Sequence, residues 1–298
     1  MKTEVSIIIV NYNCEEHVCN CIESIYKNTR ETGFEIIVVD NASVVYSVEA
    51  ISKRFPGVKV IVNEENLGFG TANNIGAREA LGRYLFFLNP DTILLNDAVG
   101  VFYRFLEESK NNIASCGGKL LNWDGSPNKT FGHFPTLFQQ LSDLGFRKFY
   151  WKFYDKKLTM GRGCDFKVIR LVDYIVGAAF CIKKQVFDEM KGFDERFFLY
   201  YEETDLFFRM QKAGYKSYLL PSVEIIHLEG VTTLSGVPFN YGMWEMMEKS
   251  RYYYFTKNRG RFVSFCVRLV QVVWLLNNYL FGKVRIDLKR AVGITFRA

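Results

Sequence analysis

The chain has 298 residues and is 49% apolar, which allows a sizeable core and excludes a disordered protein. Its net charge of +6 is uneven, because residues 249–298 hold eleven Lys or Arg and one acidic residue, a net +10, so residues 1–248 carry −4. The basic charge therefore belongs to the tail, and we expect no nucleic-acid partner for the body.

The cysteines and the N-terminus both indicate a compartment. The seven cysteines are odd in number and irregular in spacing, which predicts free thiols in a reducing cytosol. The first apolar run is too short for a signal peptide and has no cleavage site after it. We therefore expect a cytoplasmic body.

The first ninety residues alternate apolar runs with helical patterns. Runs without polar alternation are typical of strands buried on both faces. The predicted strands are Val5–Val10, Glu35–Val39, Val58–Val62 and Leu85–Leu88, and the predicted helices are Glu15–Asn28, Val48–Phe55 and Thr71–Leu81. This alternation predicts an α/β fold, with a parallel sheet covered by helices on both faces.

Beyond residue 90 the pattern is more varied. Asn122–Cys164 is rich in aromatic and basic residues with weak periodicity, and we expect an irregular excursion there. The other predicted elements are helices at Ala98–Glu108, Lys184–Met190 and Leu199–Ala213, and strands at Ile113–Leu121, Leu171–Val176, Tyr215–Leu219 and Val223–His227.

The last fifty residues differ from the body. Trp244–Phe255 has a helical pattern, and Phe262–Phe281 is long enough to span a membrane but contains Arg268. At 100° per residue one helix face is apolar and the opposite face is polar, and basic residues flank the segment. The apolar face holds Phe262, Phe265, Leu269, Val273, Leu276 and Leu280, the polar face Ser264, Arg268, Gln271 and Asn278, and the flanks Arg259, Arg261, Lys283, Arg285, Lys289 and Arg290. This pattern favours an amphipathic helix on a membrane surface, with packing on the domain or on a dimer partner as the alternative.

Polar side chains follow three of the predicted strands where each strand ends. They are Asn11, Tyr12 and Asn13, then Asp40, Asn41 and Ser43, then Asn89 and Asp91. The carboxyl ends of parallel strands meet at the edge where open α/β sheets bind ligands, which predicts a polar crevice there. Tyr12 could stack on a base, and Asp40 could accept from a base imide N–H or a ribose hydroxyl. The alternative is that these residues only form turns and helix caps.

The loop Asn66-Leu-Gly-Phe-Gly70 leads into a predicted helix. Its glycines let the backbone approach a ligand closely. The loop matches neither GxGxxG nor GxxxxGK[ST], so the dinucleotide and P-loop hypotheses lose support. A plain loop with a helix cap is the alternative.

Acidic residues and one histidine complete the candidate chemistry. Glu202, Glu203 and Asp205 begin a predicted helix, where burial of clustered carboxyls would raise a pKa and suit a general base. The alternative is a solvated helix N-terminus. His227 lies at a strand end and could join Asp91 around a divalent metal.

Taken together, these residues resemble glycosyltransferase family 2, with the GT-A fold, over about residues 4 to 235. The matching pieces, in order, are Val5–Asn13, Val38–Ser43, Asn66–Gly76, Phe87–Thr92, Gly177–Phe180, Gly192–Asp194, Tyr201–Leu206 and Arg209. The Asn-Pro-Asp form and the Gly-Phe-Gly loop are most similar to the rhamnosyltransferase-like branch, which builds bacterial surface polysaccharides. The resemblance implies a mixed, mainly parallel GT-A sheet followed by amphipathic C-terminal helices.

The resemblance also implies roles for residues. Asp91 and His227 would hold Mg²⁺ or Mn²⁺ on the donor diphosphate, and the Glu202/Glu203/Asp205 cluster would supply the base. The implied nucleotide-sugar-binding residues are Asn11, Tyr12, Asn13, Asp40, Asn41, Asn66, Gly68, Phe69, Gly70, Asn74, Asn89, Gly177 and Ala178. A single displacement by the acceptor hydroxyl would invert the anomeric centre.

The chain departs from the family pattern at two positions. Asn89 replaces the first carboxylate of the common Asp-x-Asp motif, which leaves Asp91 as the firm carboxylate ligand. Glu203 replaces the usual Asp of the base, and its extra methylene shifts the reach by roughly an Å.

The sequence therefore predicts an inverting, metal-assisted glycosyltransferase. The donor would be dTDP-rhamnose or a UDP-sugar, and the acceptor a lipid-linked or growing surface polysaccharide. We expect a catalytic domain over residues 1–243 and a basic helical segment over 244–298, peripheral on the inner face of the cell membrane, with a homodimer as an open alternative. A sugar-phosphate nucleotidyltransferase would need a basic glycine-rich loop after the first strand, where Asn11–Glu16 is acidic. A non-catalytic member that binds glycan or a partner protein is the remaining alternative.

Overall fold

The computed structural model describes residues 2–45, 49–142, 144, 167–228, 240–280 and 287–298. The predicted helix start at Val48, about half of the Asn122–Cys164 excursion and the basic residues Lys283 and Arg285 lie outside these ranges.

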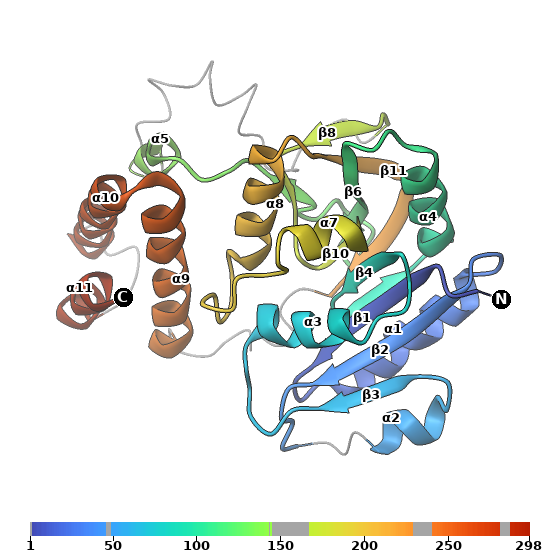
Figure 1. The fold of residues 1–298 in the computed structure, drawn as a ribbon. Helices are drawn as coiled ribbons and strands as arrows, with labels where there is room; N and C mark the ends of the chain where they lie inside the picture. Colours follow the sequence, from blue (N-terminus) through green and yellow to red (C-terminus); the bar gives the residue numbers. More distant parts are fainter. Residues whose placement is uncertain (1, 46–48, 143, 145–166, 229–239, 281–286) are drawn as a thin grey trace.

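The first ninety residues form the alternating unit that the sequence predicted (Figure 1). Every residue of β1 and β4 is buried, because helices cover both faces of the sheet at these strands. The elements are β1 (Val5–Asn11), α1 (Glu15–Asn28), β2 (Phe34–Asp40), α2 (Glu49–Arg54), β3 (Lys59–Val62), α3 (Phe69–Arg78) and β4 (Tyr84–Leu88). β1 pairs in parallel with both β2 and β4, which confirms the predicted parallel core.

The rest of the body extends the sheet. Its elements are β5 (Thr92–Leu94), α4 (Ala98–Glu108), β6 (Ile113–Leu121), β7 (Phe131–Gly132), α5 (Leu137–Leu141), β8 (Arg170–Val172), β9 (Tyr174–Ile175), β10 (Ala179–Lys183), α7 (Lys184–Glu189), α8 (Glu202–Lys212) and β11 (Lys216–His227). The strand order is β3-β2-β1-β4-β10-β6-β11-β5, with β8 paired to β11, and β7 and β9 form a separate pair. Because β10 runs antiparallel between β4 and β6, the sheet is mixed.

Helices cover both faces of this sheet, as predicted. One apolar cluster joins α1, α2 and α4 to one face, and a second joins α3, α7 and α8 to the other. Burial of these apolar faces is the main favourable contribution to folding, at about 25 cal/mol per Å². The layers hold the strand ends in fixed positions at one edge.

Several predicted boundaries are corrected by the structure, and the strand expected over Leu171–Val176 is divided into β8 and β9, which belong to different sheets. The strands expected at Tyr215–Leu219 and Val223–His227 form one strand, β11, whose register shifts around Pro221 because proline cannot donate to the ladder. The helix expected from Leu199 begins at Glu202, because Tyr200 and Tyr201 both adopt left-handed backbone with φ of 69°.

The tail forms three helices at one end of the molecule: α9 (Tyr241–Arg259), α10 (Arg261–Leu280) and α11 (Leu288–Arg297). Figure 1 shows α9 standing beside α8, with α10 and α11 on its outer side. The sequence predicted the first of these helices from Trp244, but Asn240 caps it and it begins at Tyr241. The division into domains at residue 243 stays a prediction.

Candidate active site

The carboxyl ends of β1 and β2 form one side of the candidate site. Asn11 and Asp40 are paired across the two strands, and Asn11 Nδ2 donates to Asp40 Oδ1 at 2.6 Å. The Ser43 hydroxyl also donates to Asp40, and Asn13 Oδ1 accepts from the backbone of the following turn. Tyr12 is 46% exposed beside this buried network, so its ring is accessible for stacking.

The glycine-rich loop is held by amides rather than left open. Asn41 Nδ2 donates to Asn66 Oδ1 at 2.7 Å, and Asn66 Oδ1 also accepts from the Gly68 N–H at 3.0 Å. Gly68 has φ of +83°, and a Cβ there would collide with the carbonyl oxygen of Phe198. The Phe69 N–H donates to that same carbonyl at 2.9 Å. The loop is therefore clamped to the segment that precedes α8.

Asn74 makes a second clamp between α3 and the turn before α8. Its Nδ2 donates to the Phe193 carbonyl and its Oδ1 accepts from the Phe193 N–H, both at 2.9 Å. The predicted nucleotide contact of Asn74 stays a prediction, since its amide is already engaged by the Gly192–Phe193 turn.

Glu202 and Glu203 stand at the start of α8 and face different loops. A Cβ on Gly70 would lie 3.4 Å from Glu202, and a Cβ on Gly177 would lie 3.7 Å from Glu203. Burial raises the pKa of Glu203, and burial and then the charge of Glu203 raise the pKa of Glu202 well above its usual range. The acid pair therefore joins the predicted donor loop to the Gly177–Ala178 backbone.

Asp205 has a different environment from its two neighbours. Its carboxylate is fully buried, and it accepts from Arg209 Nε at 2.7 Å, from Lys257 Nζ at 2.7 Å and from Asn258 Nδ2 at 2.8 Å. Three donors satisfy this group, and two of them, Lys257 and Asn258, lie on α9 and hold it against α8. Asp205 is therefore placed as a structural anchor, whereas the sequence could not separate it from the two glutamates.

The structure brings Asp91 and His227 together, as the sequence predicted. His227 Nε2 lies 3.4 Å from Asp91 Oδ1 and 3.5 Å from Asn89 Nδ2. Antiparallel pairing of β5 with β11 sets His227 opposite Thr92 and thus beside Asp91. Among the described residues, no third His, Cys, Asp or Glu joins them.

These residues fit a divalent cation that is shared with a substrate. Within the described part of the chain, Asn89 Oδ1 is buried without a hydrogen-bond partner, which leaves an oxygen available beside Asp91. Mg²⁺ is commonly held by one or two carboxylates together with substrate phosphates, and Mn²⁺ also accepts imidazole. The set of one carboxylate, one imidazole and one amide oxygen suits that arrangement.

The backbone conformation that positions the acid pair was not predicted from the sequence. Two consecutive non-glycine residues, Tyr200 and Tyr201, hold left-handed backbone immediately before Glu202, a conformation that costs about 1–3 kcal/mol per residue. The Tyr201 ring packs at a tilt against Tyr254 of α9, with the ring centroids 5.4 Å apart, and Ser250 of α9 donates to the Leu199 carbonyl. Helix α9 therefore supports the turn that positions Glu202 and Glu203.

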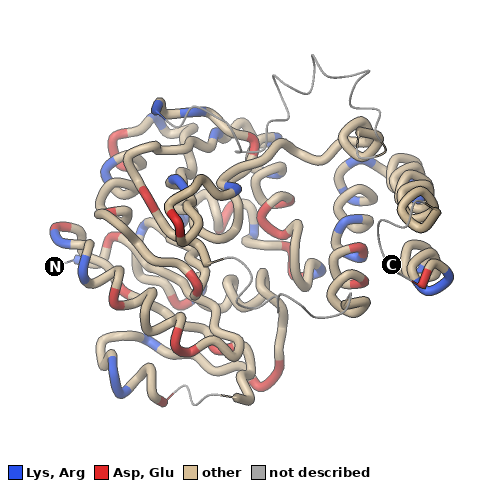
Figure 2. The backbone as a smooth tube through the Cα atoms, turned by 180° about the vertical axis from the view of Figure 1, so that it is seen from behind, with Lys and Arg blue, Asp and Glu red and all other residues tan. Residues whose placement is uncertain are grey.

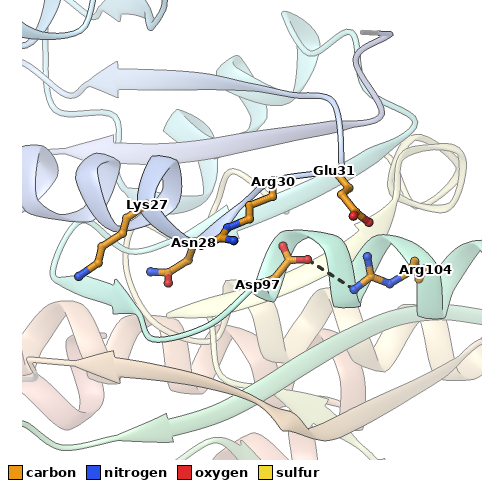
Figure 3. A pocket seen from close by; sticks show the side chains of 6 residues that line it. All are labelled: Lys27, Asn28, Arg30, Glu31, Asp97 and Arg104. Carbon is orange, nitrogen blue, oxygen red and sulfur yellow. Dashed lines mark hydrogen bonds and ion pairs between the residues drawn. The ribbon is translucent and has the colours of Figure 1, made fainter.

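Two clefts in the described surface lie apart from these residues. Figure 3 shows one of about 530 Å³ between the end of α1 and the start of α4, where Arg104 pairs with Asp97. A second, of about 620 Å³, contains the His133–Asp173 pair, at 3.0 Å, and Arg170. Neither is lined by a predicted site residue.

Replacing Glu202 with Gln should make stability less dependent on pH. The raised pKa means that the folded protein binds this proton more tightly than the unfolded chain does. The resulting stabilisation is present below the usual pKa, about 4.3, and is lost as pH rises through the raised pKa. The melting temperature of Glu202→Gln minus that of the unmodified protein should therefore increase with pH, by roughly 2–4 °C per kcal/mol.

Thermal melts of the two proteins at about pH 5 and pH 8 test this expectation. Glu195→Gln, at an exposed carboxylate outside the acid pair, is the reference substitution with which the Glu202→Gln difference is compared. A Glu202→Gln difference that does not change with pH would contradict the raised pKa.

The mixed sheet with helices on both faces is a feature of GT-A glycosyltransferases, and comparisons with solved structures bear out that fold. A structure of GalNAc-T7 with UDP, GalNAc and Mn²⁺ matches at a TM-score of 0.61 with 17% identity, over 86% of this chain and 51% of that one. A structure of S. aureus TarS residues 1–349 matches at 0.53 with 14% identity, over 98% of this chain and 90% of that one.

The family model for glycosyl transferase family 2 matches residues 6–170, and the chain belongs to that family. N-acetylglucosaminyl-diphospho-decaprenol L-rhamnosyltransferase of Mycobacterium tuberculosis is 24% identical over 78% of each chain. Rhamnosyltransferase WbbL of Escherichia coli K12 is 26% identical over 75% of this chain and 83% of its own. The protein is thus a glycosyltransferase of the rhamnosyltransferase-like branch, which confirms the family expected from the sequence.

Proposed function

We propose that the protein moves a sugar from a nucleotide-diphospho-sugar to a hydroxyl of a lipid-linked or growing surface polysaccharide, with inversion at the anomeric carbon. The donor would be dTDP-rhamnose or a UDP-sugar, and Mg²⁺ or Mn²⁺ would assist. The observation that carries the proposal is the acid pair, with the buried Glu202 against Gly70 of the predicted donor loop and the partly buried Glu203 against Gly177. The names of the two rhamnosyltransferases support this donor and acceptor class.

The donor would lie along the strand-end edge. Tyr12, whose ring is accessible, would stack on the base, and Asp40 would accept from the base or ribose while it keeps its bonds to Asn11 and Ser43. The loop between Asn66 and Gly70 would approach the donor through its backbone, since its side-chain amides already shape the turn.

Glu203 is the proposed general base. The Asp205 carboxylate is already paired with Lys257 and Arg209, each at 2.7 Å, so it serves the packing of α8 rather than the acceptor. Glu203 has a raised pKa and lies beside Gly177, so it can accept the acceptor hydroxyl proton as that oxygen attacks from the face opposite the leaving diphosphate. A single in-line attack inverts the anomeric configuration.

Asp91 and His227 would hold the metal, with Asn89 Oδ1 as a further oxygen ligand. A divalent ion in that position neutralises charge on a nucleoside diphosphate. Around it, Asn89 is fixed by its N–H, which donates to the Ala178 carbonyl at 2.8 Å. The chain thus ties the metal corner to the Gly177–Ala178 backbone.

The two alternative functions have less support. A nucleotidyltransferase would need basic side chains after β1, where the turn holds Glu15 and Glu16. A non-catalytic glycan-binding or partner-binding member would not need the buried, mutually repelling Glu202 and Glu203, whose desolvation lowers stability. We place the enzyme in the cytoplasm, peripheral to the cell membrane where a lipid-linked acceptor would be reached.

A thermal-shift screen of nucleotide sugars tests the proposed donor. A ligand that binds only the folded state raises the melting temperature by mass action, by about 2.7 kcal/mol of stability at 100 times its Kd. We expect dTDP-rhamnose or a UDP-sugar to raise it in the presence of Mn²⁺. No shift with any nucleotide sugar, and no release of a nucleoside diphosphate with a lipid-linked glycan acceptor, would overturn the assignment.

Replacing Asp91 with Asn should weaken metal-supported nucleotide binding. The substitution removes the one carboxylate at the metal corner and keeps the shape of the side chain. We expect the added affinity that Mn²⁺ gives for a nucleoside diphosphate to fall by about 10–100-fold, as measured by calorimetry with and without Mn²⁺. Asp97→Asn, at a helix cap in the cleft of Figure 3, is the control. Unchanged Mn²⁺-dependent binding by Asp91→Asn would refute the metal assignment.

A further inference from the structure

Helix α10 turns its polar face toward the protein and its apolar face outward, the reverse of a helix that packs on a protein core. Its inward face is largely polar, and the described residues buried there are Ser264, Val267, Gln271, Leu275 and Asn278. Its outward face is apolar and consists of Phe262, Phe265, Leu269, Val273, Leu276, Tyr279 and Leu280, each at least 41% exposed. We call these seven residues the outer face of α10.

The inward polar face is fixed by specific contacts. Ser264 bonds to Thr256 Oγ1 at 2.9 Å and donates to the Tyr252 carbonyl, both on α9. The Arg268 guanidinium lies 4.0 Å above the centre of the Tyr252 ring and donates to the Thr295 carbonyl of α11. These contacts set the rotation of α10, so the exposure of its apolar side is built into the packing.

A contiguous apolar surface of this size needs a partner, because monomeric proteins in water seldom leave such a surface uncovered. Residues Phe262 and Leu280, at opposite ends of the helix, are 78% and 75% exposed, so the face runs along its whole length. Within the described part of the chain, α10 is the one helix long and apolar enough to cross a membrane.

A spanning orientation conflicts with the packing of α10. To cross a bilayer, the helix would have to break the Arg268 contacts and leave Ser264, Gln271 and Asn278 facing lipid. With those residues kept against α9 and α11, the helix can only lie along a surface, with its apolar side toward the acyl chains.

Charge indicates the chemistry of that surface. Residues 249–298 carry a net +10, and Arg261, Lys289, Arg290 and Arg297 are exposed on α10 and α11. Figure 2 shows Lys and Arg gathered on the helix at the C-terminus, while the adjacent α10 is mostly tan. An apolar face with basic residues beside it matches the headgroup and acyl layers of an anionic membrane.

We propose that the outer face of α10 docks in the plane of an anionic phospholipid bilayer, with the basic residues of α10 and α11 at the headgroups. This inference deepens the proposed function, because it names the surface that would bring the acid pair to a lipid-linked acceptor. It requires no bound donor, so it can be tested without the chemistry. Helix α9 would transmit the docked orientation, since it contacts α10 on one side and the turn before Glu202 on the other.

Vesicle co-flotation of the full chain, without nucleotide sugar, tests the proposal. Vesicles of phosphatidylcholine with about 30% phosphatidylglycerol should carry the protein, and pure phosphatidylcholine should carry on the order of tenfold less. The double substitution Leu269→Glu/Val273→Glu should lower flotation on the anionic vesicles by tenfold or more, on the order of the loss expected for two charges in the apolar layer. The control is Leu81→Glu/Trp123→Glu, at apolar side chains on the body that are more exposed than Leu269 and Val273, and its flotation should be unchanged.

Three outcomes would overturn the proposal. One is failure of the unmodified protein to float with anionic vesicles. Another is flotation of Leu269→Glu/Val273→Glu equal to that of the control. The third is a dimer in lipid-free buffer, seen by sedimentation, that this double substitution splits, because a second copy would then cover the outer face. Donor binding by thermal shift is measured on the same variants, so loss of flotation with retained donor binding separates docking from the transfer activity.

Discussion

Glu203→Gln should lower the rate of sugar transfer by about 10²–10⁴-fold while leaving donor affinity unchanged. The variant keeps the size of the side chain beside Gly177 but cannot take a proton from the acceptor hydroxyl. Because the substitution removes a charge from a buried pair, the fold should be retained. Transfer of labelled sugar and donor binding by thermal shift, measured on the same preparation, give the two readouts.

Two further measurements make this expectation specific. Activity of the unmodified enzyme should rise with pH, with its inflection above the usual carboxyl range, because the base must be ionised and burial raises its pKa. Glu195→Gln, outside the acid pair, serves as the control and should keep the full rate. Near-normal turnover by Glu203→Gln would move the base to another group, and Glu202 would then be the residue to test.

Asp205→Ala should destabilise the fold by about 3–5 kcal/mol, the range for breaking a buried ion pair by removal of one partner. The substitution leaves Lys257 and Arg209 without the buried carboxylate that both contact at 2.7 Å, and it removes the acceptor of the Asn258 amide. We therefore expect a weaker contact between α8 and α9 and a lower free energy of unfolding, which chemical denaturation measures.

A surface pair supplies the control for this prediction. Asp188→Ala breaks a pair with Lys184 on α7 that is largely exposed and should cost about 0.3–0.5 kcal/mol. Asp205→Asn adds a second test, because it keeps the hydrogen-bonding shape while it removes the charge. If Asp205→Ala is as stable as Asp188→Ala, Asp205 does not anchor α8 and its assignment as a structural residue fails.

The sequence predicts the first half of the fold well, because local signals there agree with tertiary structure. The run Leu85–Leu88 is apolar at every position and Val5–Val10 at every position except Ser6, a pattern typical of a strand buried on both faces. The predicted meeting of Asp91 with His227 is also confirmed by their 3.4 Å separation, although the two lie 136 positions apart in the chain. The hypothesis came from the residue types and the strand-end position of His227, and the family resemblance added the metal role, whereas the strand order that places the two side by side is not encoded in a local pattern.

The sequence could not predict features that depend on contacts between distant segments. No local signal sets Tyr200 and Tyr201 in left-handed backbone, because that conformation is stabilised by packing on α9 rather than by a glycine. The local sequence Glu-Glu-Thr-Asp also cannot predict that Glu203 and Asp205 have different environments. They follow from Lys257 and Asn258, some fifty residues later in the chain.

Helix α9 also determines where this enzyme can be shortened or joined to another protein. Lys257 bridges Asp194 and Asp205, so a chain cut after Tyr254 would remove one cationic partner from each of these carboxylates. The first permissible joint is Gly260, whose φ of +94° separates α9 from α10. A shortened or chimeric enzyme should therefore be joined at that glycine. The catalytic domain then keeps α9, and only α10 and α11 are exchanged.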